Sequence, residues 1–257
     1  MGVIPKYARG VEVDAPGREV DAPTVMSLLY TNLVEYGHLT PWFGPCQPPL
    51  GSRLLNHADH VQLIENGIDH GRGGVWVDFG AGSGAFTLAL RDIAGPDAEI
   101  IAIDRDRDSL QTLRATMERQ FPGTRLRLLE ADMAGPLTLP PLDGIVAAKA
   151  IHFVPFQDQT ALLRRWRDYL KPEGLLVVVE YDADSGNRWA PYPMSYAAFR
   201  EMARVAGFTE PTLFGSRPSR WLGRIYSADA SHPGNSYSIT RTRSVSLNKR
   251  NELASPC

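Results

Sequence analysis

The sequence has few cysteines, almost no net charge and no long apolar run. Its 257 residues include two cysteines, Cys46 and Cys257, which stand far apart. They cannot form the disulfide framework of a small secreted domain, and such scarcity is typical of a reducing cytosol. The formal net charge of −2 gives no general sign of a nucleic-acid partner.

No stretch approaches the ~20 apolar residues that span a bilayer, so we expect no membrane span. Residues 1–18 carry charges and prolines without an apolar run. We therefore expect no signal peptide and a cytoplasmic location. Apolar residues make up 43% of the chain, which is enough for the core of one α/β domain of roughly 150–200 residues.

The composition divides the chain into three zones. Residues 1–55 are rich in proline and glycine and predict a partly ordered extension or lid, with one short helix over 24–36. Residues 56–230 alternate apolar runs with helical patterns. Residues 231–257 hold Ser, Asn, Thr and Arg with almost no large apolar side chain, and predict a disordered tail.

The middle zone reads as alternating strands and helices with short connections. Strands are predicted over 75–79, 99–103, 125–129, 144–148 and 175–180, and two weaker ones over 211–214 and 222–228. Helices are predicted from Asn56 and over 85–93, 108–120, 159–170 and 195–206, with a turn at 171–174. This order predicts an α/β fold, a doubly wound and mostly parallel sheet. Ligands bind such sheets at the carboxyl ends of the strands.

The most informative motif is the segment Asp-Phe-Gly-Ala-Gly-Ser-Gly from Asp78 to Gly84, between a predicted strand and a predicted helix. Glycine lets a backbone approach a ligand closely and adopt positive φ. The spacing is G-x-G-x-G, whereas a dinucleotide-binding turn prefers G-x-G-x-x-G. The third glycine therefore comes one residue early for a nicotinamide dinucleotide.

This segment resembles motif I of the class I S-adenosylmethionine-dependent methyltransferases, and the likeness extends over residues 56–230. It is closest to the small-molecule members, including the quinone-biosynthesis type. The resemblance implies a Rossmann-like sheet of seven strands with the last strand antiparallel, and S-adenosyl-L-methionine as cofactor. It places the following residues around the cofactor: Asp78, Gly80, Ala81, Gly82 and Gly84.

Acids at the ends of the next two strands extend the resemblance. Asp104 ends the second strand, and a carboxylate there can accept two hydrogen bonds from a ribose diol, each worth roughly 1.5–3 kcal/mol. Asp132 and Met133 follow the third strand, where the family binds the adenine amino group and ring. We expect Arg105 to join this cofactor site. Asp106 and Asp108 read as solvated charges, with Asp108 as a helix N-cap.

The segment after the fourth strand faces the transferred methyl group in the family. It carries Lys149, expected beside the cofactor, and an Ile151-His152 pair that is frequent in small-molecule members. The Asn/Asp-Pro-Pro-Tyr pattern of nucleobase-amine methyltransferases is absent. His152 is the candidate catalytic residue, either as a general base or as a group that shapes the pocket. Transfer to an atom that is already nucleophilic needs no base, which favours the second role.

Weaker features stay open. His57, Asp59 and His60 are too few for a metal site, so none is expected, and the helix that holds them is expected to cover the cofactor. Aromatic residues and one arginine after the fifth strand can hold an aromatic or anionic substrate, or simply pack a loop. They are Arg188, Trp189, Tyr192 and Tyr196.

These signals together predict S-adenosylmethionine-dependent methyl transfer to a small-molecule acceptor, mainly by holding the nucleophile in line with the sulfonium methyl. Three alternatives remain: an RNA or protein methyltransferase, an NAD-dependent oxidoreductase and a non-catalytic cofactor-binding module. A continuous basic patch would favour the first, and its members would be Arg217, Arg220, Arg224, Arg241, Arg243, Lys249 and Arg250. The sequence identifies neither the acceptor nor the oligomeric state.

Overall fold

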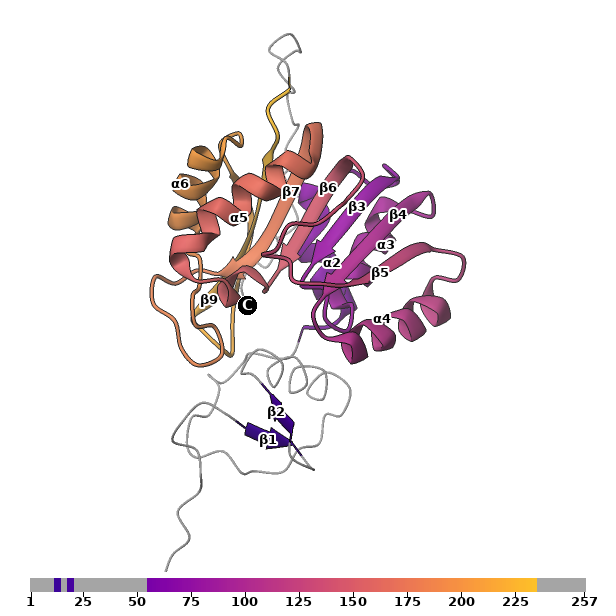
Figure 1. Ribbon diagram of the computed structural model, residues 1–257. Coiled ribbons are helices and arrows are strands. Elements are labelled where there is room, and N and C mark those ends of the chain that lie inside the picture. Colours follow the sequence, from indigo (N-terminus) through magenta and orange to yellow (C-terminus); the bar gives the residue numbers. More distant parts are fainter. Residues whose placement is uncertain (1–11, 15–17, 21–54, 235–257) are drawn as a thin grey trace, which may run out of the picture.

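The computed structural model describes residues 12–14, 18–20 and 55–234 (Figure 1). Strands β1 (Glu12–Asp14) and β2 (Arg18–Val20) pair antiparallel. The helix expected over 24–36 and residues 235–257 of the expected tail lie outside the described residues. The start of that tail is ordered instead, because Ser231 ends β9 and the His232 N–H donates to the Gly174 carbonyl at 2.9 Å. Within those residues, no helix is both long enough and apolar enough to cross a membrane.

A seven-stranded sheet forms the centre of the domain, in the order β5-β4-β3-β6-β7-β9-β8. Neighbouring strands are parallel from β5 to β7, and β9 runs antiparallel to both of its neighbours. This confirms the predicted Rossmann-like sheet with an antiparallel last strand. The strands are β3 (Gly74–Phe79), β4 (Ala98–Asp104), β5 (Arg125–Glu130), β6 (Leu142–Ala148), β7 (Leu170–Tyr181), β8 (Thr212–Pro218) and β9 (Arg224–Ser231).

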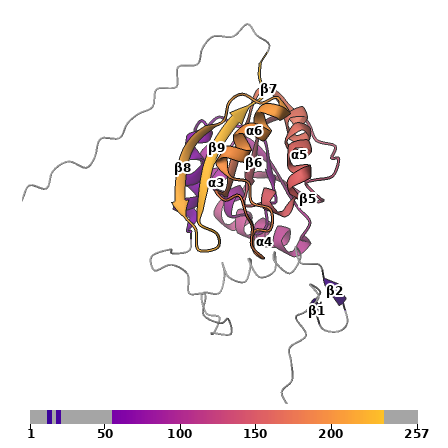
Figure 2. The ribbon, with the colours of Figure 1, turned by 90° about the vertical axis from the view of Figure 1, so that its left-hand side faces the viewer.

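Helices cover both faces of this sheet (Figures 1 and 2). One apolar cluster joins α5 and α6 to the sheet through Trp166 and Phe199, and Phe79 stacks on Trp166 at 4.5 Å. Other clusters join α2, α3 and α4 to the opposite face. The helices are α2 (His57–Ile64), α3 (Ala85–Ala94), α4 (Arg107–Gln120), α5 (Phe156–Tyr169) and α6 (Tyr196–Ala206).

Two local predictions need correction. Residues 171–174 are not a separate turn but part of β7, where they bulge out opposite Asp143 while Glu173 adopts φ +64°. Lys171 holds this bulge through an ion pair of 2.8 Å to Asp143. The N-cap of α4 is Asp106, whose carboxylate accepts the N–H of Asp108. Asp108 lies in the first turn of α4 instead.

Candidate active site

A cavity of about 560 Å³ opens at the carboxyl ends of the parallel strands. The strand order reverses between β3 and β6, and such a switch point is where open α/β sheets bind ligands. Its volume is in the range of small-molecule sites. The predicted residues that line it are Asp78, Gly80, Ala81, Gly82, Asp104, Arg105, Asp132, Met133, Lys149 and His152.

The glycine turn forms the middle of the cavity wall. Gly80 has φ +72°, and a Cβ there would lie 2.5 Å from the Cβ of Ala150. Gly82 has φ +51°, but a Cβ on it would meet no heavy atom within 4 Å. Gly80 therefore brings the strand ends of β3 and β6 together, whereas Gly82 leaves open space for a ligand.

Gly84 is the one predicted cofactor residue that is not part of the cavity wall. It is the N-cap of α3 with φ +94°, and a Cβ there would lie 2.2 Å from Leu113 Cδ1 on α4. The spacing that suggested a ligand contact at Gly84 thus serves close packing of α3 against α4.

Asp78 lies under the turn as a buried acid, 1% exposed. Its carboxylate accepts a hydrogen bond of 2.6 Å from the Thr87 hydroxyl of α3. Burial raises the pKa of Asp78 to about 7, with a smaller contribution in the same direction from the Asp104 charge, while the Thr87 hydrogen bond opposes the shift. Asp78 is therefore partly protonated near neutral pH.

Asp104 ends β4 and faces the same turn. One carboxylate oxygen accepts the N–H of Gly82 at 2.8 Å, and the other accepts the N–H of Asp106 at 2.9 Å. Burial raises the pKa of Asp104, and these backbone hydrogen bonds oppose the shift. A ligand diol at this edge would meet a carboxylate that the backbone already holds in place.

Asp132 and Met133 follow β5 and complete this end of the cavity. The Asp132 carboxylate accepts the N–H of Ala134 at 2.9 Å and lies 4.0 Å from the Arg105 guanidinium. Met133 lies beside the turn, with its sulfur 3.7 Å from the position of a Cβ on Gly80. The residues predicted for ribose and adenine therefore share one end, over β4 and β5.

Lys149 follows β6 at the opposite end. Its backbone has φ +54°, a conformation that non-glycine residues rarely adopt, and its N–H donates to the Val179 carbonyl at 2.7 Å. The ammonium lies 5.7 Å from the centre of the Phe86 ring. Burial lowers the pKa of Lys149 to about 8, although the Glu180 charge opposes the shift.

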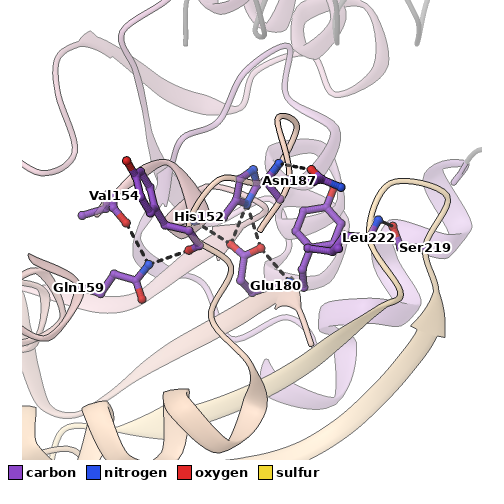
Figure 3. Close-up of polar contacts among 10 residues, drawn as sticks. His152, Val154, Gln159, Glu180, Asn187, Ser219 and Leu222 are labelled. Atoms are coloured by element: carbon purple, nitrogen blue, oxygen red, sulfur yellow. Dashed lines mark hydrogen bonds and ion pairs between the residues drawn. The ribbon is translucent and has the colours of Figure 1, made fainter. Parts of the chain in front are cut away.

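His152 is held from behind by Glu180, at the end of β7 (Figure 3). The ring Nδ1 lies 2.9 Å from Glu180 Oε1, and the His152 backbone N–H donates to Oε2 at 3.2 Å. The side chains are 4% and 0% exposed. With Nδ1 as the donor to the carboxylate, Nε2 is left for any contact in the cavity.

Two loops line this end of the cavity. The Asn187 side chain joins the loop after β7 to the β8–β9 loop by donating to the Trp221 carbonyl at 2.8 Å. Trp189 and Trp221 both line the cavity, and their ring centres are 5.2 Å apart. The sequence does not reveal Trp221, because only the folded β8–β9 hairpin brings it to strand ends that lie 40 or more residues earlier in the chain.

The other residues predicted to follow the fifth strand make packing contacts or hydrogen bonds within the protein. Tyr192 packs against Phe156 with ring centres 5.5 Å apart, and the Tyr196 hydroxyl donates to the Pro211 carbonyl at 2.9 Å. The exposed Arg188 lies 4.4 Å over the Trp189 ring.

Helix α2 contributes no residue to the cavity wall in the part of the chain that is described. His60 instead packs against Phe86 of α3, with ring centres 4.9 Å apart. Asp59 forms a 2.6 Å ion pair with Arg217 of β8. The expectation that α2 covers the cofactor is therefore not met. The ion pair with Asp59 also neutralises Arg217, one member of the suggested basic patch. The four basic residues of the tail lie outside the described residues.

The fold and this glycine-turn cavity define the class of protein: a Rossmann-like methyltransferase domain. A family model described as "Methyltransferase domain" matches residues 77–174. This match supports a class I S-adenosylmethionine-dependent methyltransferase and covers the segment from the glycine turn to the start of β7.

Two curated relatives and a solved structure illustrate the similarity. A probable cobalt-precorrin-6B C(15)-methyltransferase (decarboxylating) of Thermoplasma volcanium is 32% identical over 75 residues, which cover 29% of this chain and 37% of that protein. A ribosomal RNA small subunit methyltransferase A of Nitrobacter winogradskyi is 38% identical over 90 residues, covering 35% and 30%. The chain thus spans only about a third of the length of these relatives.

Among solved structures, the N-methyltransferase NodS of Bradyrhizobium japonicum in complex with S-adenosylhomocysteine has a TM-score of 0.53 and 17% identity. The match covers 69% of this chain and 85% of NodS. At this identity the likeness concerns the fold.

Proposed function

We propose that this protein transfers the methyl group of S-adenosyl-L-methionine to a small-molecule acceptor, and that residues 56–230 form the domain that does so. The observation that carries the proposal is the order of the predicted site residues along one cavity. The strand order places the ends of β5, β4, β3 and β6 side by side. The predicted adenine, ribose, amino-acid and acceptor contacts follow in that same order.

The cofactor would lie across β5, β4 and β3. Asp132 and Met133 would receive the adenine, Asp104 the ribose hydroxyls, and Arg105 would flank them. The amino-acid part would lie along Gly80, Ala81 and Gly82, above the buried carboxyl of Asp78. The open space at Gly82 supports this placement, because a Cβ there would meet nothing of the protein.

The acceptor end has the chemistry of a small apolar pocket. Phe153, Tyr181, Trp189 and Trp221 line it together with Lys149 and His152. The Asn187 side chain joins the two loops that carry Trp189 and Trp221, and these aromatic walls suit a small ring better than a macromolecule. The similarity to a ribosomal RNA methyltransferase keeps an RNA acceptor as the second candidate.

The protein's main part in the reaction is positioning. The cofactor supplies an electrophilic methyl group, and aligning a nucleophile with it can contribute roughly 7–11 kcal/mol. His152 would shape the acceptor end, because Glu180 and the neighbouring rings hold it firmly. Its ring centre lies 4.2 Å from that of Phe153 and 5.1 Å from that of Tyr181.

An untargeted labelling experiment tests this function. The protein is incubated with methyl-labelled S-adenosylmethionine and a cell extract, and the label is then followed into small molecules, RNA and protein. Label in the small-molecule fraction, lost in an Asp104→Ala variant, is the expected result. Label that enters RNA or protein alone would contradict the choice of acceptor and leave the cofactor assignment standing.

A further inference from the structure

Among the described residues, Lys149 is the one lysine on the cavity wall, and its position separates it from the cofactor contacts. Lys149 follows β6 and Tyr181 ends β7, whereas Asp104 ends β4 and Asp132 follows β5. With neighbouring strands about 4.8 Å apart, Lys149 lies about 10 Å from the ribose end of the sheet. It therefore faces the end at which the methyl group would be transferred.

The charge of Lys149 has the same sign as a sulfonium. Two like charges at short distance in a poorly hydrated cavity repel each other strongly. A protonated Lys149 would thus oppose binding of the methyl donor unless an anion lay beside it or its proton were lost. Burial lowers the pKa of Lys149 to about 8, which makes both the charged and the neutral form accessible near neutral pH.

The surroundings of Lys149 are largely aromatic. The ammonium lies over Phe86, and Tyr181, Trp189 and Trp221 line the same end of the cavity. Other charged or titratable groups also line the cavity: His152, Asp78 under the turn, Tyr181, and Asp158 and Arg165 of α5. Glu180 binds His152 at 2.9 Å, and its charge also acts on Lys149. A flat apolar ring fits this wall, and Lys149 offers it one polar partner.

On the basis of the proposed function, we propose that Lys149 serves the acceptor: it accepts the proton of an acidic hydroxyl on an aromatic or enol-like substrate and then pairs with the oxygen. The O–H proton passes to the Lys149 amine, the oxygen forms a bond to the methyl carbon, and the sulfur–methyl bond breaks with its electron pair passing to sulfur. The products are the methyl ether, the neutral thioether and a protonated Lys149, which returns its proton to water.

A binding experiment without turnover tests this assignment. Calorimetry measures the affinities of S-adenosylmethionine and S-adenosylhomocysteine for the wild-type protein and for Lys149→Met. We expect the affinity for S-adenosylhomocysteine to stay within about 3-fold, and that for S-adenosylmethionine to rise by roughly 10-fold relative to it, because a like charge is removed. A loss of more than about 10-fold for both ligands would overturn the proposal, since Lys149 would then bind the cofactor's carboxylate.

The acceptor side is tested with 4-nitrophenol, whose anion absorbs visible light. Added to protein saturated with S-adenosylhomocysteine, its pKa should fall by about one unit, a tenfold preference for the anion. Lys149→Met should abolish this shift and Lys149→Arg should retain it. Lys171→Met is the matched control, because Lys171 pairs with Asp143 at the amino ends of β6 and β7, away from the cavity, and should leave the shift unchanged.

The outcomes distinguish the two proposals. A wild-type protein that binds S-adenosylhomocysteine but leaves the pKa of 4-nitrophenol unchanged, or a Lys149→Met variant that keeps the shift, would contradict the role of Lys149. A wild-type protein that binds neither cofactor form would contradict the proposed function itself.

Discussion

The carboxylate of Asp104 accepts a hydrogen bond of 2.8 Å from the backbone N–H of Gly82. The acid that ends β4 is thereby tied to the glycine turn that follows β3. One interaction thus joins two motifs that lie 22 residues apart in the sequence. This hydrogen bond orients the Asp104 carboxylate before a ligand binds, so binding costs little further side-chain entropy.

Replacing Asp104 should therefore weaken cofactor binding strongly. Asp104→Ala removes the proposed acceptor of two ribose hydroxyls, and we expect S-adenosylhomocysteine to bind about 2–4 kcal/mol more weakly in calorimetry. Asp108→Ala is the control, since Asp108 is an exposed charge in the first turn of α4 and should change the affinity by less than about 1 kcal/mol. Equal losses from both variants would place the ribose elsewhere.

The two glycines Gly82 and Gly84 should separate affinity from stability. Gly84→Ala forces a Cβ onto Leu113 at positive φ, and we expect roughly 2–4 kcal/mol of lost unfolding free energy in urea titrations. Gly82→Ala adds a methyl group to open space and should cost about 1 kcal/mol. Its main effect should be weaker cofactor binding. A Gly84→Ala variant as stable as the wild type would contradict the close packing of α3 on α4 at this position.

The buried Asp78 should make the wild-type protein less stable as the pH rises. Its pKa is raised from 3.8 to about 7, so the folded state holds a proton that the unfolded chain releases in this window. The contribution of Asp78 to stability is thus present below about pH 4 and is lost as the pH rises to about 7, up to about 4 kcal/mol.

Asp78→Asn keeps an oxygen that can accept the Thr87 hydroxyl but cannot ionise. The unfolding free energy of Asp78→Asn minus that of the wild type should therefore increase between about pH 4 and pH 7 and then level off. Titrations with urea at several pH values measure it. A difference that does not change with pH would show that Asp78 is ionised throughout.

We expect Glu180 to contribute to the stability of the fold and His152 to contribute to acceptor binding. Glu180→Ala leaves the donors of His152 and Tyr181 without their buried acceptor and should cost about 3–5 kcal/mol of stability. His152→Ala should weaken acceptor binding while the pH profile of the rate survives. A His152→Ala variant that loses turnover by about 10²-fold or more, with an altered pH profile and unchanged acceptor affinity, would make His152 a general base.

Much of the site was predictable because its chemistry follows strand ends. Asp78, Asp104 and Asp132 each stand at or just after an apolar run, and parallel strands bring such ends to one edge. What the sequence could not show depends on tertiary packing. Gly84 is needed for close packing because Leu113 of α4 leaves no room for a Cβ there. Trp221 lines the cavity because the β8–β9 hairpin brings it there. Glu180 was assigned to a strand, but its contact with His152 joins residues 28 apart.

The central claim is that this cavity binds S-adenosyl-L-methionine. Calorimetry with S-adenosylmethionine, S-adenosylhomocysteine and NAD on the full chain tests it most directly. We predict that the first two bind and that NAD does not, because the third glycine of the turn comes one residue too early for a dinucleotide site. Tighter binding of NAD than of either sulfur compound would contradict it.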